Sequence, residues 1–173
     1  MTSPTRGTLD PAMVGATVGP MTHVIDARWL MAYAAGLGET DATYFDTLGS
    51  SGPLAHPLFP VCYEWPVAVA LRDKTIAQEL QPQSVHATHH LVIHRLPRAG
   101  DTLRTTARVT EVVPRRAGTL VISRFETVDA GGNPVSTTDY GSVYRDVALA
   151  GNEAAHRQPK AGAAGAPGAG PGP

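Results

Sequence analysis

A chain of 173 residues and 18.1 kDa has room for one ordinary domain, because a second domain needs a core of its own. Its 42% hydrophobic and 17% charged residues are typical of a globular protein, and no stretch approaches the roughly 18 uninterrupted apolar residues of a membrane span. The formal net charge is −1, so no general positive field draws the chain to nucleic acid or anionic lipid. Composition therefore excludes an integral membrane protein, and we expect no membrane and no nucleic-acid partner.

The two ends of the chain differ in composition from the middle. The end is rich in Ala, Gly and Pro and cannot bury enough apolar surface to offset the entropy of ordering. We therefore expect a flexible N-terminus over residues 1–10, one domain over 11–149 and a disordered tail over 150–173. The start lacks the apolar core of a secretory signal, and the single Cys62 cannot form an intrachain disulfide, so we expect a cytoplasmic location.

The first predicted helix follows an extended piece over residues 13–18. Asp26 can accept hydrogen bonds from backbone N–H groups and cap a helix over residues 27–35. Trp29 and Tyr33 are four residues apart, so they share one face of that helix. The pattern predicts a short amphipathic helix, and the glycines after it supply an end.

A second, longer helix is predicted after an irregular segment. Residues 39–60 contain a cluster of Gly, Ser and Pro, which favours loop structure. The helix is expected over residues 64–80, with Pro66 in the first turn, where its missing N–H would be unpaired anyway. The apolar residues expected on its buried face are Trp65, Val69, Ile76 and Leu80.

Beyond residue 82 the hydrophobic period changes to two, which is the spacing of strands. The four runs that show this alternation or a high β propensity are 85–94, 103–109, 119–128 and 135–147. The short connections between them imply antiparallel neighbours. Such a sheet buries the longer helix by wrapping around it, so the sequence predicts an α+β fold.

Seven histidines raise the question of a metal site. On a strand His86, His90 and His94 share one face, but successive members lie about 13 Å apart at roughly 3.3 Å per residue. His89 is expected on the opposite face, and the cysteines of a zinc site are lacking. We therefore expect no metal ion and no other cofactor.

Three segments carry a resemblance to a known family. They are residues 33–46 (YAAGLGETDATYFD), 56–66 (HPLFPVCYEWP) and 94–103 (HRLPRAGDTL). In this order they resemble the hot-dog-fold MaoC-like dehydratases, and more closely the N-terminal-type dehydratase domain of that family. The resemblance runs from about residue 18 to residue 145. It implies a hot-dog fold, in which an antiparallel sheet wraps around a central helix.

The resemblance implies reversible addition of water across the double bond of an α,β-unsaturated acyl thioester. In the family an Asp and a His after the first helix activate the water, and backbone N–H groups at the start of the central helix polarise the thioester carbonyl. Matched by position, Glu39 stands for the Asp, Asp41 for a neighbouring Asn and Tyr44 for the His. A phenol with a pKa near 10 cannot replace an imidazole as a proton shuttle. The chain thus most resembles the half that shapes the acyl site while a partner supplies the Asp and His.

Other candidate site residues lie near the central helix and in a turn of the sheet. His56 stands among prolines before the helix. It is either an acid or base that replaces the family's histidine, or a loop histidine that hydrogen-bonds to nearby backbone. Arg95 is a candidate for binding the phosphates of coenzyme A or a phosphopantetheine arm, which guanidinium geometry suits. The residues expected to line the acyl pocket are Pro57, Phe59, Val61 and Tyr63.

The leading interpretation is an (R)-specific 3-hydroxyacyl-thioester dehydratase or enoyl-thioester hydratase that acts as a substrate-binding subunit with a catalytic partner. Two sheets would join edge to edge in a homodimer or heterodimer, and the substrate would be an acyl-CoA or acyl-carrier-protein thioester. One alternative is a self-sufficient hydratase in which Glu39 is the base and Tyr44 or His56 holds the water. The others are a non-catalytic acyl-thioester-binding protein and a hot-dog thioesterase.

Overall fold

The computed structural model describes residues 6–49 and 52–151. In chain order the elements are β1 (Gly7–Leu9), η1 (Pro11–Met13), β2 (Thr17–Val24), α1 (Ala27–Gly36), η2 (Ala42–Tyr44), α2 (Pro60–Thr75), η3 (Gln78–Gln83), β3 (Ser84–Ile93), β4 (Thr102–Arg115), β5 (Gly118–Val128), β6 (Pro134–Arg145) and β7 (Val147–Leu149). The η elements are single 3-10 turns or short 3-10 helices.

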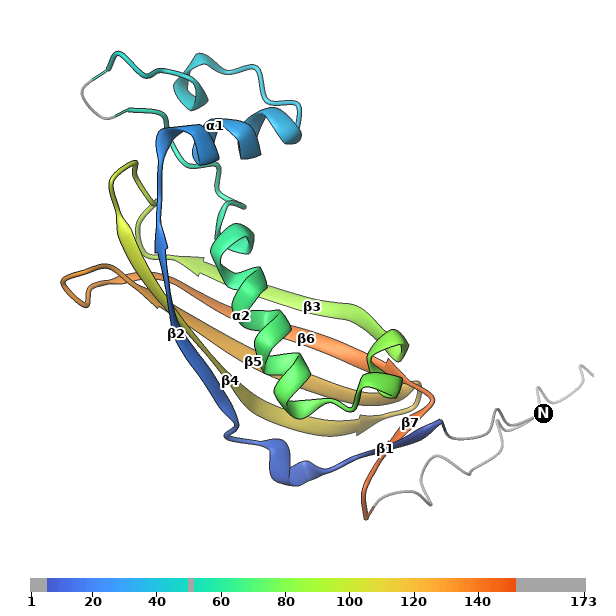
Figure 1. Cartoon of the computed structure of the whole chain (residues 1–173). Helices are drawn as coiled ribbons and strands as arrows, with labels where there is room; N and C mark the ends of the chain where they lie inside the picture. Colours follow the sequence, from blue (N-terminus) through green and yellow to red (C-terminus); the bar gives the residue numbers. More distant parts are fainter. Residues whose placement is uncertain (1–5, 50–51, 152–173) are drawn as a thin grey trace, which may run out of the picture.

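An antiparallel five-stranded sheet in the order β2-β4-β5-β6-β3 curves around α2 (Figure 1). The inner side of α2 buries Val67 and Leu71 against Ala107, Val109 and Phe125 of the sheet. The predicted α+β arrangement, with an antiparallel sheet wrapped around a central helix, is therefore confirmed.

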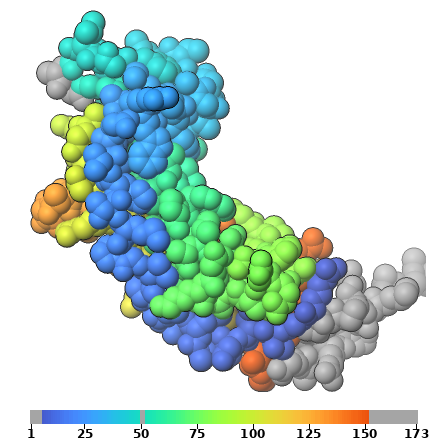
Figure 2. Space-filling view, viewed as in Figure 1, coloured from blue at the N-terminus to red at the C-terminus, as the bar shows by residue number. Residues whose placement is uncertain are grey.

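Helix α1 starts where the sequence predicts. The Asp26 carboxylate accepts the Trp29 N–H at 2.7 Å and so caps the first turn. Together with the loop that follows, α1 projects beyond the end of the sheet (Figure 2). We call residues 27–49 and 52–59 the overhang. A second, smaller core beneath it, which includes Leu30 and Phe59, fixes the overhang to the start of α2.

Helix α2 differs from its prediction in both its limits and its buried face. It begins at Pro60, four residues earlier than expected, so Pro66 lies inside the helix rather than in its first turn. Trp65, expected to be buried, is 52% exposed. The buried side instead includes Glu64, whose carboxylate interrupts the apolar pattern from which the face was predicted. The predicted last turn, around Leu80, is the separate element η3.

Strand β3 carries a bulge that corrects the prediction for its histidines. The pairing of β3 with β6 shifts register between His86 and Thr88. Because an extra residue reverses the alternation of side chains, His86 and His89 lie on one face, with ring centroids 5.5 Å apart. The expectation that His89 points to the opposite face from His86 was therefore wrong.

The described part of the N-terminus contains a short strand that the sequence does not predict. Gly7–Leu9 form β1, which pairs in parallel with β7, although residues 1–10 were expected to be flexible. Of the predicted tail, residues 152–173 lie outside the described residues. Within the ranges that the structure describes, no helix is both long and apolar enough to cross a membrane.

Candidate active site

The overhang brings together the three residues that the sequence singles out as catalytic. Glu39 Oε1 lies 3.3 Å from His56 Nε2. Between centroids, the Tyr44 ring lies 5.6 Å and the Tyr33 ring 6.0 Å from the His56 ring. His56 is therefore the centre of a small cluster formed by two separate parts of the loop.

Hydrogen bonding defines which nitrogen of His56 carries the proton. Its Nδ1 accepts the backbone N–H of Leu58 at 3.1 Å, so the neutral ring carries its proton on Nε2. Nε2 is the ring nitrogen that lies near the carboxylate of Glu39. Since the His56 side chain is 14% exposed and the Glu39 side chain 35%, the carboxylate is the more accessible member of the pair. The arrangement places a carboxylate that could act as a base against an imidazole that could orient it.

The backbone conformation after α1 positions Glu39 and Tyr44. Gly38 adopts a φ of +78° and lets the chain leave α1, while the Glu39 N–H donates back to the Ala34 carbonyl at 3.1 Å. Asp41 caps η2 by accepting the Thr43 N–H at 2.9 Å and its hydroxyl at 2.8 Å. These bonds hold the pKa of the Asp41 carboxyl below its usual value. Asp41, a predicted substrate-binding residue, thus orients the turn that carries Tyr44.

The first turn of α2 offers fewer free donors than the resemblance implies. Pro60 has no N–H. The Cys62 N–H donates to the Phe59 carbonyl at 2.9 Å, and the Val61 N–H donates to the Leu58 carbonyl at 3.3 Å. The N–H groups expected to polarise a thioester carbonyl are therefore engaged within the turn, and the longer Val61 bond is the weaker of the two.

The four residues predicted to line the acyl pocket separate into two groups. Pro57 and Val61 are exposed at the surface of the overhang and of α2. Phe59 is fully buried, with its ring in edge contact with Trp29 at 5.3 Å. Tyr63 is also fully buried, and its hydroxyl shares a 3.0 Å hydrogen bond with Ser136. The two aromatic residues are thus part of the core.

Arg95, predicted to bind phosphate, is held by carboxylates of the sheet turns. Its guanidinium lies 2.6 Å from Asp101 and 3.4 Å from Asp129. It also donates to the Leu96 carbonyl at 3.2 Å. These contacts join two neighbouring turns, so the Arg95 side chain holds the turns together.

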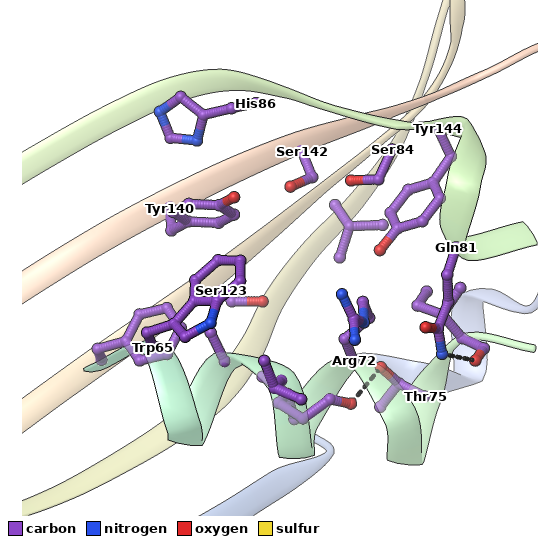
Figure 3. Close-up of a pocket in the computed structure, with 16 residues that line it drawn as sticks. Trp65, Arg72, Thr75, Gln81, Ser84, His86, Ser123, Tyr140, Ser142 and Tyr144 are labelled. Atoms are coloured by element: carbon purple, nitrogen blue, oxygen red, sulfur yellow. Dashed lines mark hydrogen bonds between the residues drawn. The ribbon is translucent and has the colours of Figure 1, made fainter. Parts of the chain in front are cut away.

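A cavity of about 270 Å³ lies between α2 and the inner face of the sheet (Figure 3). None of the residues predicted to bind substrate lines it. Its lining residues are Trp65, Ala68, Val69, Leu71, Arg72, Thr75, Ile76, Gln81, Ser84, His86, Val121, Ser123, Phe125, Tyr140, Ser142 and Tyr144. In the sequence, the feature that could have indicated this cavity is the hydroxyl group on every second residue of β6.

A buried carboxylate lies between α2 and β6. Glu64 is 5% exposed and accepts hydrogen bonds from the hydroxyls of Thr138 at 2.7 Å and Ser136 at 3.4 Å. Burial raises the pKa of the Glu64 carboxyl to about 7, and the two hydrogen bonds oppose that rise. The sequence does not reveal this group, because a glutamate on a predicted helix is ordinarily solvated.

A family model matches most of the chain and shows which family it belongs to. Residues 12–138 match the family described as FAS1-like, dehydratase domain region. The chain belongs to this family. Membership confirms the dehydratase resemblance, and the matched residues include the whole overhang. No protein with a curated description matches the chain.

Solved structures share the fold of this FAS1-like dehydratase domain. The truncated HadBC (3R)-hydroxyacyl-ACP dehydratase complex of Mycobacterium tuberculosis is 16% identical with a TM-score of 0.66, over 75% of this chain and 96% of that chain. A MaoC-like dehydratase from Phytophthora capsici is 24% identical with a TM-score of 0.62, over 79% and 48%. The (R)-hydratase from A. caviae is 13% identical with a TM-score of 0.56, over 75% and 95%. These similarities confirm the hot-dog fold.

Proposed function

We propose that this chain catalyses reversible hydration of α,β-unsaturated acyl thioesters, with Glu39 as the group that takes and returns the proton and His56 as the residue that orients it. The observation that carries the proposal is the 3.3 Å contact between these two side chains in the overhang. The match to a dehydratase family over residues 12–138 supports the reaction class. The names of the solved structures with this fold, among them (R)-hydratases and hydroxyacyl-ACP dehydratases, point to the same chemistry.

In the hydration direction Glu39 removes a proton from water as the water oxygen bonds to C3 of the enoyl group. The electron pair of the double bond moves toward the thioester carbonyl and forms an enolate. The protonated Glu39 then returns its proton to C2, so H and OH are both added and the carboxylate is regenerated. His56 keeps its Nε2–H toward Glu39 throughout and orients the carboxylate. Dehydration is the same sequence reversed.

A second hot-dog chain is proposed at the edge of the sheet. Strand β3 is an edge strand of ten residues, most of them exposed, and its free backbone groups can pair with another strand. Two of the solved structures with this fold are named as complexes of two chains, HadBC and ChsH1–ChsH2 of Mycobacterium tuberculosis. We therefore propose a dimer with either a second copy or a different hot-dog chain, with coenzyme A or acyl carrier protein as the thioester carrier.

A second candidate function is that of a substrate-binding subunit whose partner supplies catalysis. Two observations favour it. Tyr44 stands at the position of the family's histidine, and the N–H groups at the start of α2 are already engaged. The two candidates agree on the thioester substrate and differ in which chain moves the proton.

The experiment follows crotonyl-CoA with the purified chain alone, by loss of enoyl-thioester absorbance, with free thiol measured in parallel. The proposal predicts hydration without thiol release. If the chain binds the thioester but does not hydrate it, catalysis by Glu39 is contradicted and the subunit candidate is favoured. The subunit candidate then predicts that adding a catalytic hot-dog chain restores turnover. Release of thiol contradicts both candidates, because a thioesterase breaks the bond that hydration leaves intact.

A further inference from the structure

The inner face of β6 is unusually rich in hydroxyl groups for a strand that faces a core. The residues that alternate on this face are Ser136, Thr138, Tyr140, Ser142 and Tyr144. Ser136 and Thr138 bond to Glu64. The other three line the cavity beneath α2. A wall that packs an alkyl chain needs none of these hydroxyls, so their presence needs another explanation.

The remaining walls of the cavity are also partly polar (Figure 3). Ser123 of β5 adds a hydroxyl, His86 of β3 adds an imidazole with its ring centroid 4.5 Å from that of Tyr140, and Arg72 points in from α2. Apolar contact comes from Trp65, Phe125 and their neighbours on α2 and the sheet. The cavity is therefore lined by both polar and apolar side chains, and most of its hydroxyl groups come from the strands.

Several of these hydroxyls have unused hydrogen-bonding capacity. Within the part of the chain that the structure describes, the side-chain hydroxyls of Ser123, Tyr140 and Ser142 form no hydrogen bond. A plain alkyl chain in the cavity would displace the water that hydrogen-bonds to these hydroxyls and would offer no hydrogen bond in its place. Leaving one hydroxyl without a hydrogen bond costs about tenfold in affinity. An occupant that carries oxygen atoms avoids this cost.

We propose that the cavity beneath α2 selects acyl chains that carry hydroxyl or carbonyl oxygens over plain alkyl chains. The inference rests on the proposed function, because it treats the occupant as the acyl group of a thioester. At roughly 30 Å³ for each water-sized group, the 270 Å³ cavity holds about nine non-hydrogen atoms. An oxygen near the far end of a chain of about eight carbons would therefore meet Tyr140, Ser142 and Ser123.

The test measures binding directly, with saturated thioesters that cannot be hydrated. Trp65 lines the cavity and is 52% exposed, so its fluorescence reports on entry. Octanoyl-CoA, 7-hydroxyoctanoyl-CoA and 7-oxooctanoyl-CoA are titrated against the full chain and against its Trp65→Phe variant, which identifies the signal that comes from the cavity. We expect the oxygenated chains to bind at least about fivefold more tightly, the equivalent of one net hydrogen bond.

Matched variants separate the cavity from the rest of the surface. The double variant Tyr140→Phe with Ser142→Ala removes two hydroxyls with little change of shape, and we expect it to bind the three thioesters about equally. Thr22→Ala removes an exposed hydroxyl of β2, outside the cavity, and we expect it to keep the preference. Circular dichroism of each variant checks the fold. Equal or tighter binding of octanoyl-CoA to the unmodified chain, no binding of any thioester, or a preference that survives in the double variant overturns the proposal.

Crotonyl-CoA hydration, measured on the same preparation, separates this inference from the proposed function. Hydration without a preference for oxygenated chains overturns the cavity proposal and leaves the function standing. If the preference depends on Tyr140 and Ser142 but crotonyl-CoA is not hydrated, the cavity proposal is supported and the proposal that this chain catalyses hydration alone is contradicted.

Discussion

Replacing Glu64 with glutamine is expected to stabilise the protein at neutral and higher pH. The carboxyl has an ordinary pKa of 4.5 in an unfolded chain and about 7 in the folded protein, where burial disfavours its charged form. The folded state therefore binds this proton more tightly. The contribution of Glu64 to the free energy of unfolding is therefore largest below pH 4.5 and is lost as the pH rises through 7. Since each unit of pKa is worth about 1.4 kcal/mol, the loss is about 3 kcal/mol.

Glutamine suits this comparison because it keeps the carbonyl oxygen that accepts from Thr138 and cannot ionise. The assay is urea denaturation of the unmodified chain and of Glu64→Gln between about pH 4.5 and pH 8. Relative to the unmodified chain, the variant should gain about 3 kcal/mol over this range. Glu79→Gln, at an exposed position of η3, is the matched control and should show no such change. A difference between Glu64→Gln and the unmodified chain that stays constant with pH would contradict the raised pKa of the Glu64 carboxyl.

Three further substitutions test how the overhang and the turns are held. Asp26→Ala removes the acceptor of the Trp29 N–H and should cost about 1 kcal/mol in urea denaturation; an unchanged midpoint contradicts the cap. Phe59→Ala removes a fully buried ring and should cost about 3 to 5 kcal/mol; a cost under about 1 kcal/mol contradicts its place in the core. Arg95→Met should lower the melting temperature slightly, with a cost of about 1 kcal/mol, and leave thioester affinity unchanged. A large loss of affinity would instead assign Arg95 to the substrate's phosphates.

The strands and α1 are predictable because their signals are local. Residues 103–109 alternate by side-chain type along one strand, and Asp26 precedes its helix at the capping position. The face of α2 is not predictable in this way. Its buried side includes Glu64, which is tolerated only because Thr138, more than 70 residues later, provides a hydroxyl partner.

The candidate site is predictable in its members and only partly in its arrangement. The resemblance singles out Glu39 and Tyr44, and the prolines around His56 single out that residue, but their mutual contact depends on how the loop folds over α2. The faces of His86 and His89 depend on a bulge that no alternation pattern reveals. The cavity also escaped prediction, because its walls come from α2, β3, β5 and β6 together.

The most direct test of the central claim is the rate of crotonyl-CoA hydration by the purified chain beside its Glu39→Gln variant. Glutamine keeps the size of the side chain and cannot accept the proton from water. We expect measurable hydration by the unmodified chain and a loss of at least about 100-fold in kcat in the variant, the scale of a lost general base. His56→Asn should lower kcat by a smaller factor, since the imidazole orients the base. Equal rates for the unmodified chain and Glu39→Gln would contradict the assignment of Glu39 as the catalytic base.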